Sequence, residues 1–267
     1  MTLVGERMAH IGVIGGSGFY SLLDDSEEFD IKTPFHNDPV KVFVGDYNGK
    51  EIAFIPRHGP GHRYAPHKIP YKAHIWALKS LGVHDVIAPC AVGSLKKEIK
   101  PGDFVVFDQF VDRTSGRDDT FYHDSPVIHV AGAHPYCPKL REITIEAAKE
   151  LNIPIKESGT VVVIQGPRFS TAAESKWFSD QGWDVVNMTQ YPECILTKEQ
   201  EMCYVGIGLV TDYDAGIHGG ETVNLAKVIE VLNKNNELVK LLIKRMIEKI
   251  SADDCTCHHS LDGARVG

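Results

Sequence analysis

The chain has 267 residues, a length at which one large domain buries most of the surface of its unfolded state. Hydrophobic residues make up 43% and charged residues 24%, close to the globular average, which excludes a disordered chain. The formal net charge of -8 argues against a nucleic-acid partner, and no apolar run is long enough to cross a membrane. Residues 1–7 also lack the apolar segment of a signal peptide, so we expect a cytoplasmic protein.

Apolar runs separated by turn residues predict alternating strands and helices. The run from Met8 to Ile14 predicts a strand that enters the glycine turn Gly15-Gly-Ser-Gly18. Residues 40–55 predict a hairpin whose turn contains Asn48-Gly49. Further strands are predicted at 86–89, 104–107, 160–164, 185–188 and 205–211, and helices at 70–81, 138–151, 169–181, 195–204 and 222–250, the last one interrupted near 233–236.

Strand followed by helix, repeated, is typical of an α/β domain with a mostly parallel central sheet. No linker or repeat interrupts the pattern, so we expect one domain over residues 1–267, with 255–267 as a cysteine-containing tail. Sites in such folds lie at the carboxyl ends of strands. The polar segments 15–18, 91–94, 187–189 and 212–214 all follow predicted strands, and we expect them to meet in one cleft.

Asp212 and Asp214 come after an apolar strand, where alternate residues point to the same face. A carboxylic acid in a partly apolar cleft has its pKa raised by desolvation and by a like-charged neighbour, so it can donate a proton to a purine ring nitrogen. The alternative is an aspartate that caps a helix in a loop. Met188, next to Asn187, can pack against a sugar or simply fill the core.

Two upstream segments offer groups for a phosphate. The glycine turn presents backbone amides and the Ser17 hydroxyl, although a plain tight turn explains the same residues. It lacks the third glycine of the dinucleotide fingerprint, because Ser21 stands in that place. Arg57 and His58 follow a strand and offer a bidentate donor and a second donor, or else form a surface pair.

The spacing of cysteines and histidines predicts no metal site. The chain has no Cys-x-x-Cys pair, and His58-x-x-x-His62 lies in a glycine-proline loop. Cys90 and Cys194 are expected to be buried thiols. Disulfides, which are rare in the cytosol of mesophiles but occur in hyperthermophiles, and free thiols are both open for Cys137, Cys203, Cys255 and Cys257.

Five segments taken together resemble a known family. They are Ile11-Gly-Val-Ile-Gly-Gly-Ser-Gly18, Pro56-Arg-His-Gly59, Gly166-Pro-Arg-Phe-Ser170, Asn187-Met-Thr189 and Thr211-Asp-Tyr-Asp214. In this order they resemble the methylthioadenosine phosphorylases, of the trimeric branch of the purine nucleoside phosphorylases, over nearly the whole chain. The resemblance implies a three-layer α/β/α fold with a distorted central sheet, and a homotrimer or a dimer of trimers.

The resemblance also implies roles for individual residues. Phosphate would be held by Ser17, Arg57, His58, Thr189 and the backbone amide of Ala91. The nucleoside would contact Phe169, Asn187, Met188 and the pair Asp212 and Asp214, which would read a 6-amino purine. The apolar lid for a methylthio group would be Val223, Leu225, Val228 and Ile229, and His129 would reach the pocket of a neighbouring subunit.

The chain departs from the family pattern at three places. Cys90 stands where a threonine is expected, so a hydroxyl contact to phosphate is absent there, and Gln165 replaces a glutamate. The tail with Cys255-Thr-Cys257 lies outside the family core and resembles an archaeal, heat-adapted elaboration. These departures leave adenosine, inosine and guanosine open as further substrates.

The expected reaction is the phosphorolysis of S-methyl-5'-thioadenosine to adenine and 5-methylthioribose 1-phosphate, with phosphate as co-substrate and no metal or organic cofactor. Asp212 would act as the acid that protonates the departing base. Three alternatives are a broad purine nucleoside phosphorylase, a hydrolytic nucleosidase and a purine-binding sensor without chemistry. Free-base release measured with and without phosphate separates them.

Overall fold

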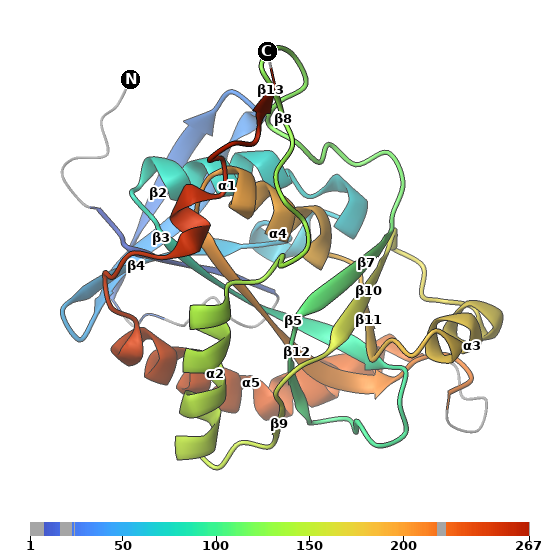
Figure 1. Cartoon of the computed structure of the whole chain (residues 1–267). Helices are drawn as coiled ribbons and strands as arrows, with labels where there is room; N and C mark the ends of the chain where they lie inside the picture. The colour runs from blue at the N-terminus through green and yellow to red at the C-terminus, as the bar shows by residue number, and fades with distance from the viewer. Residues whose placement is uncertain (1–7, 17–22, 24, 218–222, 267) are drawn as a thin grey trace.

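The structure, a computed structural model, describes residues 8–16, 23, 25–217 and 223–266. A large twisted sheet crosses the molecule, with helices on both faces (Figure 1). Its continuous path has the strand order β2-β3-β4-β1-β5-β11-β10-β7, and β12 pairs with β5 and β6. The strands are β1 (Ile11–Gly15), β2 (Ser26–Thr33), β3 (His36–Tyr47), β4 (Lys50–Pro56), β5 (Asp85–Ser94), β6 (Phe104–Val106), β7 (Gln109–Arg113), β9 (Ile155–Lys156), β10 (Thr160–Ile164), β11 (Val185–Asn187) and β12 (Cys203–Tyr213).

The sheet is mixed, and its direction changes at one place. The central strands β4, β1, β5 and β12 are parallel to one another, as are β11, β10 and β7. Between these two groups, β11 runs antiparallel to β5 over a short register in which Val185 lies opposite Ser94. The amino end of β11 therefore lies beside the carboxyl end of β5, and β11 is so short that its last residue, Asn187, is still close to Ala91 of β5. Polar side chains from both groups can thus share one space.

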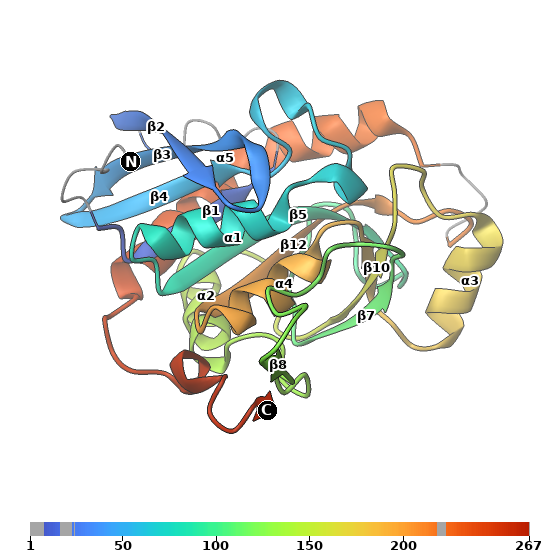
Figure 2. The same ribbon diagram turned by 90° about the horizontal axis from the view of Figure 1, so that it is seen from above.

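Two pairs of helices cover the two faces of the sheet. Helices α1 (Tyr71–Ser80) and α4 (Gln190–Glu199) pack together on one face, and α2 (Pro138–Glu150) and α5 (Leu225–Lys249) pack together on the other (Figures 1 and 2). Helix α3 (Ala172–Asp180) lies apart, beyond β10 (Figure 2). Short 3-10 turns occur at 60–62, 66–68 and 256–259, and the tail strand β13 (Arg265–Val266) pairs with β8 (Val127–Ile128).

Successive side chains of β12 point to opposite faces of the sheet, so this strand contributes to both apolar cores. Tyr204 and Val210 belong to the apolar core under α1 and α4, whereas Val205, Ile207 and Leu209 belong to the core under α2 and α5. Successive side chains of a strand point to opposite faces, so a nearly continuous apolar run is what a strand covered on both faces requires. The layered α/β/α architecture with a distorted central sheet agrees with the fold class expected from the sequence.

Most predicted elements are present, including β10 with its predicted limits and the hairpin of β3 and β4. Asn48 and Gly49 both have positive φ in that turn, as expected for an Asn-Gly hairpin. The prediction missed β2, which is mostly polar, and β7, whose residues are half-buried or exposed. Their polar side chains hide the apolar period on which the prediction depends.

Several helix limits differ from the prediction, since α3 begins at Ala172 rather than at 169 and α5 at Leu225 rather than at 222. Helix α5 is continuous through 233–236, because Leu232, Val239 and Leu242 keep one apolar face against the core and this burial outweighs weak helix propensity. Helix α4 spans Gln190–Glu199 rather than 195–204, with Tyr191 in a non-helical conformation, and residues 203 and 204 already belong to β12. None of the described helices is both long and apolar enough to cross a membrane.

Candidate active site

A cavity of about 610 Å³ lies at the carboxyl ends of β5, β11 and β12, under the first turns of α5. Twelve residues predicted for the site line it: Arg57, His58, Ala91, Phe169, Asn187, Met188, Thr189, Asp212, Asp214, Leu225, Val228 and Ile229. Segments more than 150 residues apart in the chain thus meet in one space, as expected for strand ends in an α/β sheet.

Three predicted residues stand apart from this group. Ser17 lies outside the described residues, although its neighbour Gly16 lines the cavity. Val223 precedes α5 and is not among the lining residues. His129 is exposed, follows β8, and donates its backbone N–H to the carbonyl of Ala264 at 2.8 Å, so it does not reach the cavity of its own chain.

A bulge in β12 positions the carboxyl pair. Val210 lies opposite Val92 of β5, but Asp212 lies opposite the next residue, Gly93, so Thr211 is an extra residue in the ladder. The Thr211 hydroxyl donates to Asp212 Oδ1 at 2.7 Å and fixes that carboxyl group. A Cβ on Gly93 would lie 3.1 Å from Val186 Cγ1 and in ordinary contact with Asp212 Oδ2 at 3.4 Å, so the glycine mainly accommodates Val186 of β11.

The two carboxyl groups have different surroundings. Burial raises the pKa of Asp212 to about 6, the hydrogen bond from Thr211 opposes the rise, and the charge of Asp214 adds to it. Burial also raises the pKa of Asp214, but Ser175 donates a short hydrogen bond to its Oδ2, which favours the ionised form. Asp212 is therefore the group suited to carry a proton near neutral pH, and Asp214 is the better-held acceptor.

Arg57 lies in the wall of the cavity with its guanidinium held almost completely by protein groups. The side chain is only 1% exposed and forms a bidentate ion pair with Glu193, at 2.7 Å from Nε and 2.8 Å from Nη2. Two further N–H groups donate to the carbonyls of Pro89 and Ile14. An arginine has five N–H donors, so these four bonds leave one Nη1–H for a ligand. The prediction of a bidentate phosphate fork is not the geometry seen.

His58 differs from the predicted second donor. Its Nδ1 lies 2.9 Å from the carbonyl oxygen of Tyr64, which only accepts, so Nδ1 carries the hydrogen. Burial lowers the pKa of His58 to about 4, which leaves the ring neutral and makes Nε2 an acceptor. The His58 ring also stacks on the His62 ring, with centroids 4.1 Å apart. His58 can therefore receive a hydrogen bond from a protonated phosphate oxygen, or donate only after a bound anion has raised its pKa.

Asn187 organises the loop before α4. Its Oδ1 accepts from the backbone N–H groups of Thr189 and Gln190, at 2.6 and 2.8 Å, and its Nδ2 donates to the carbonyl of Ala91 at 3.0 Å. One side chain thus ties β11, β5 and the start of α4 together. Thr189 lines the cavity just before α4, and its hydroxyl group donates to Asn187 Oδ1 at 3.3 Å.

Two further residues that line the cavity are Cys90 and Ser170. At Cys90 burial raises the pKa of the thiol to about 12, so the side chain stays neutral, and its sulfur is in hydrogen-bond contact with Gln190 Nε2 at 3.5 Å. Ser170 is buried in the cavity wall, and its hydroxyl group, beside the Asp214 carboxyl group, opposes the rise in the pKa of that carboxyl group. It ends a motif quoted in the sequence analysis, but its own position was not predicted as part of the site.

Arg117 was missed entirely. Its guanidinium lies behind the cavity and donates to the backbone carbonyls of Gln165 at 3.0 Å, Met188 at 2.9 Å and Tyr191. These carbonyls belong to loops after β10 and β11, so one cation fixes both loops. The sequence offered no signal, because Arg117 follows β7 in an irregular segment, where an isolated arginine is usually a surface residue.

If the cavity is catalytic, Arg117→Lys is expected to lower the rate of its reaction about 10- to 100-fold without direct contact to ligands, since displacing positioned loops by about 1 Å has effects of that size. A lysine has one charged nitrogen and cannot reach three separate carbonyls. The measurement is kcat/KM together with the thermal midpoint, and Arg245→Lys, at a half-buried arginine on α5 that does not line the cavity, is the matched control. Equal kcat/KM in the Arg117 and Arg245 variants would contradict the role.

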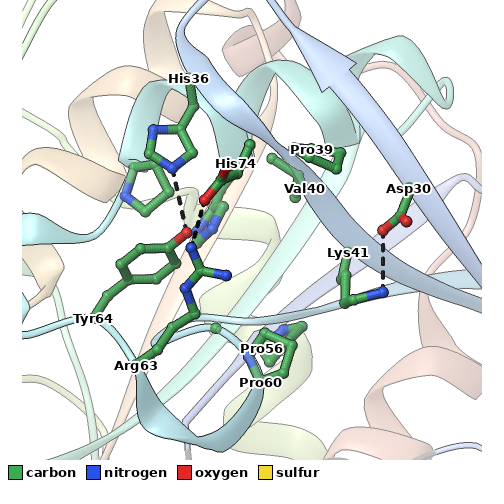
Figure 3. A pocket seen from close by; sticks show the side chains of 13 residues that line it. Asp30, His36, Pro39, Val40, Lys41, Pro56, Pro60, Arg63, Tyr64 and His74 are labelled. Atoms are coloured by element: carbon green, nitrogen blue, oxygen red, sulfur yellow. Dashed lines mark hydrogen bonds and ion pairs between the residues drawn. The ribbon is translucent and has the colours of Figure 1, made fainter.

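A second, smaller cavity lies on the other side of the Pro56–Gly59 loop. Its volume is about 280 Å³, and Figure 3 shows the charged side chains at its rim turned toward one another. His36 Nε2 lies 3.2 Å from the Tyr64 hydroxyl, and the Lys41 ammonium lies 3.2 Å from Asp30. These groups largely satisfy each other, so the larger cavity is the candidate active site.

The fold and this cavity define an α/β protein with a ligand site at the carboxyl ends of its strands, and comparisons with known proteins narrow the class. The model of the phosphorylase superfamily matches residues 10–248. The S-methyl-5'-thioadenosine phosphorylase of Pyrococcus furiosus is 49% identical over 251 residues, which cover 94% of this chain and 96% of that one. The chain therefore belongs to the phosphorylase superfamily.

Two other similar proteins bear on the substrate. The purine nucleoside phosphorylase of Streptomyces coelicolor is 44% identical over 270 residues, covering 97% of this chain and 96% of the relative. The structure of methylthioadenosine phosphorylase from Schistosoma mansoni in complex with adenine has a TM-score of 0.91 and 33% identity, covering 96% of this chain and 99% of the other.

Proposed function

We propose that this protein cleaves S-methyl-5'-thioadenosine with inorganic phosphate, giving adenine and 5-methylthioribose 1-phosphate, and that it also accepts adenosine. One observation carries the proposal: a single cavity holds an acid of raised pKa, Asp212, together with Arg57 and Thr189 at the N-terminal end of α4. A purine nucleoside and a phosphate need these groups at once. The superfamily and the name of the Pyrococcus furiosus relative support the same reaction.

The proposed mechanism follows from where charge develops. Breaking the glycosidic bond builds positive charge on the ribose and negative charge on the departing purine. A phosphate held by Arg57, Thr189 and the Ala91 amide stabilises the first charge and attacks the anomeric carbon with inversion. A protonated Asp212 donates to the purine, and general-acid help of this kind contributes about 10²–10⁴-fold.

Asp214 and Asn187 have supporting roles in this scheme. Asp214, held by Ser175, is placed to accept from the exocyclic amino group of adenine, which favours a 6-amino purine over a 6-oxo purine. Asn187 keeps the Ala91 and Thr189 backbone in place, and Met188 and Phe169 pack against the sugar and the base. No organic cofactor enters the reaction, because fixed donors supply the electrostatic stabilisation.

The apolar side chains at the start of α5 predict the preference at the 5' position. Val228 is buried in the cavity wall, and Leu225 and Ile229 line the cavity while remaining partly exposed. We expect methylthioadenosine to be favoured over adenosine by about 1–3 kcal/mol in kcat/KM, the range for small apolar groups. Competition between the two substrates measures it, and Val228→Ser should reduce the ratio toward one. A ratio of one in the unmodified protein would contradict the assignment of this face.

A second candidate is a broader purine nucleoside phosphorylase that also cleaves inosine and guanosine, favoured by the name of the Streptomyces coelicolor relative. One assay separates the candidates: methylthioadenosine, adenosine, inosine and guanosine are incubated with and without phosphate, and free base is measured. Base release that does not require phosphate would overturn both. Similar rates for all four nucleosides would favour the broader enzyme.

The proposal includes the assembly and the location expected from the sequence. His129 lies on an exposed segment away from the cavity of its own chain, which suits a residue that completes the site of a neighbouring copy in a trimer or a dimer of trimers. We expect a cytoplasmic enzyme, where nucleosides and phosphate are both present.

A further inference from the structure

Four cysteines from distant parts of the chain meet outside the candidate active site. One sulfur atom from each lies within 4.8 Å of the other three: Cys137, Cys203, Cys255 and Cys257. Cys137 and Cys203 are buried, and Cys255 and Cys257 are half-buried. All six cysteines of the chain are free thiols in the structure, so the sulfurs are not paired two by two. The disulfide interpretation is therefore not supported.

We propose that these four cysteines bind one zinc ion as a tetrahedral thiolate site that fastens the C-terminal tail to the α/β body. Structural zinc sites have four ligands at about 2.3 Å for sulfur, which places the sulfurs about 3.8 Å apart. Cys137 Sγ and Cys255 Sγ are 3.7 Å apart, in agreement with that edge. A disulfide brings each sulfur to one partner at about 2 Å and gives no reason for all four to converge.

The ligands come from rigid elements as well as from the tail. Cys137 is the residue before the first turn of α2, and its N–H donates to the carbonyl of Tyr204 at 2.8 Å. Cys203 begins β12, and its N–H donates to the carbonyl of His84 at 2.8 Å. Two ligands are thus fixed by the body, and Cys255 and Cys257 complete the set from one short turn.

Two groups around the cluster suit a site of negative charge, whereas the carboxyl group of Asp85, within 4.8 Å of Cys203 Sγ, opposes it when ionised. Zinc binding releases the four thiol protons and leaves a centre with two net negative charges. Cys137 lies at the N-terminal end of the thirteen-residue α2, which stabilises a thiolate. His258 Nε2 lies 3.6 Å from Cys203 Sγ, where a ring N–H can donate to a metal-bound sulfur.

The tail has little else to hold it. Among residues 251–266, only Ala264 is buried. The other contacts are mostly hydrogen bonds at the surface: Lys139 donates to the carbonyls of Ser251 and Asp253, Ser260 donates to the carbonyl of Lys198, the His129 N–H donates to the carbonyl of Ala264, and the two-residue strand β13 pairs with β8. The His258 ring also lies against the His84 ring, with centroids 5.4 Å apart. A segment with so small an apolar core usually depends on a metal or a covalent link for its order.

The spacing of the cysteines in the sequence did not predict the cluster, because Cys137 and Cys203 are far along the chain from each other and from the Cys-x-Cys pair of the tail. The inference is independent of the proposed enzymatic function, since no cysteine of the cluster lines the large cavity. It concerns a structural metal, so the chemistry of the active site still proceeds through protein groups and phosphate alone.

The test starts with the full chain, produced in zinc-containing medium and purified anaerobically with reductant. We expect about one zinc per chain by elemental analysis, and about four thiols that react only after a chelator or denaturant is added. Cys255→Ser and Cys257→Ser should each lower zinc content at least about tenfold after dialysis against a weak chelator. Cys194→Ala, a buried cysteine of α4 outside the cluster, should keep the metal.

A second readout covers variants that fail to fold. Chelator should lower the thermal midpoint of the unmodified protein and of the Cys194→Ala variant, and cobalt should replace zinc with the absorption of a tetrahedral thiolate site. Six reactive thiols and no retained zinc after reconstitution would overturn the proposal. A native mass lower by four hydrogens, which two disulfides produce, would overturn it equally.

Discussion

Asp212→Asn is expected to lower kcat for phosphorolysis by at least about a hundredfold, the lower end of the contribution of a positioned general acid. The asparagine keeps the size of the side chain and can still accept the hydrogen bond from Thr211, so the cavity should keep its shape. The purine then leaves without a proton from position 212. Steady-state kinetics with methylthioadenosine at saturating phosphate measures the effect.

The pH dependence of kcat/KM is an independent test of the role of Asp212. Burial raises the pKa of Asp212 to about 6, so the folded protein holds this proton at higher pH than an unfolded chain does. The protonated fraction falls as the pH rises through about 6, and kcat/KM for the nucleoside should fall with it. The stability that this group contributes is likewise complete below its unfolded pKa and is lost as the pH rises through about 6. The Asp212→Asn variant should lack the decline of kcat/KM above pH 6, and a variant that retains it would exclude Asp212 as its source.

Arg57→Met is expected to destabilise the protein by about 3–5 kcal/mol, because it leaves the carboxylate of Glu193 buried without its cation. Both side chains are 1% exposed, and the Tyr204 hydroxyl, at 2.7 Å, is the other hydrogen-bond donor to Glu193. The sequence led us to expect mainly weaker phosphate binding from loss of Arg57. The structure adds a large effect on folding, which denaturant unfolding measures.

A double variant separates the two roles of Arg57. Arg57→Met combined with Glu193→Gln removes the buried charge, so most of the lost stability should return while the KM for phosphate stays high. Arg57→Lys serves as the comparison, because it keeps the charge but cannot bind Glu193 in two places and two carbonyls as well. If the free energy of unfolding of the single Arg57→Met variant is within about 1 kcal/mol of that of the parent, Glu193 is not left as a buried unpaired charge, and the prediction is wrong.

The carboxyl ends of the strands could be predicted from the sequence, because an apolar run followed by polar residues is a pattern of neighbouring residues. Asp212, Thr189 and Ala91 were predicted for one cleft on that basis, and the structure places all three in its wall. The family resemblance added the apolar residues of α5, which no local pattern would have connected to strands many residues away. Whether each of these residues has its expected role is a matter for the kinetic experiments above.

The sequence did not predict which residues form ion pairs and hydrogen bonds with residues far away in the chain. The ion pair of Arg57 and Glu193 joins residues 136 positions apart, and it uses donors that a motif comparison assigned to phosphate. His58 is a neutral acceptor only because the Tyr64 carbonyl takes its Nδ1 hydrogen and burial lowers its pKa. Such properties depend on tertiary packing, which sets solvation and hydrogen-bond partners independently of the local residue pattern.

The extra residue in β12 limits how this site can change in evolution. Deleting Thr211 would restore regular pairing with β5 and leave Asp212 opposite Gly93, but it would remove the hydroxyl group that donates to Asp212 Oδ1. Base preference can therefore shift by exchanging side chains at 212 and 214, whereas loss of the extra residue removes the hydrogen bond that fixes the acid. Homologues that handle other purines are expected to vary the side chains and to keep the irregularity.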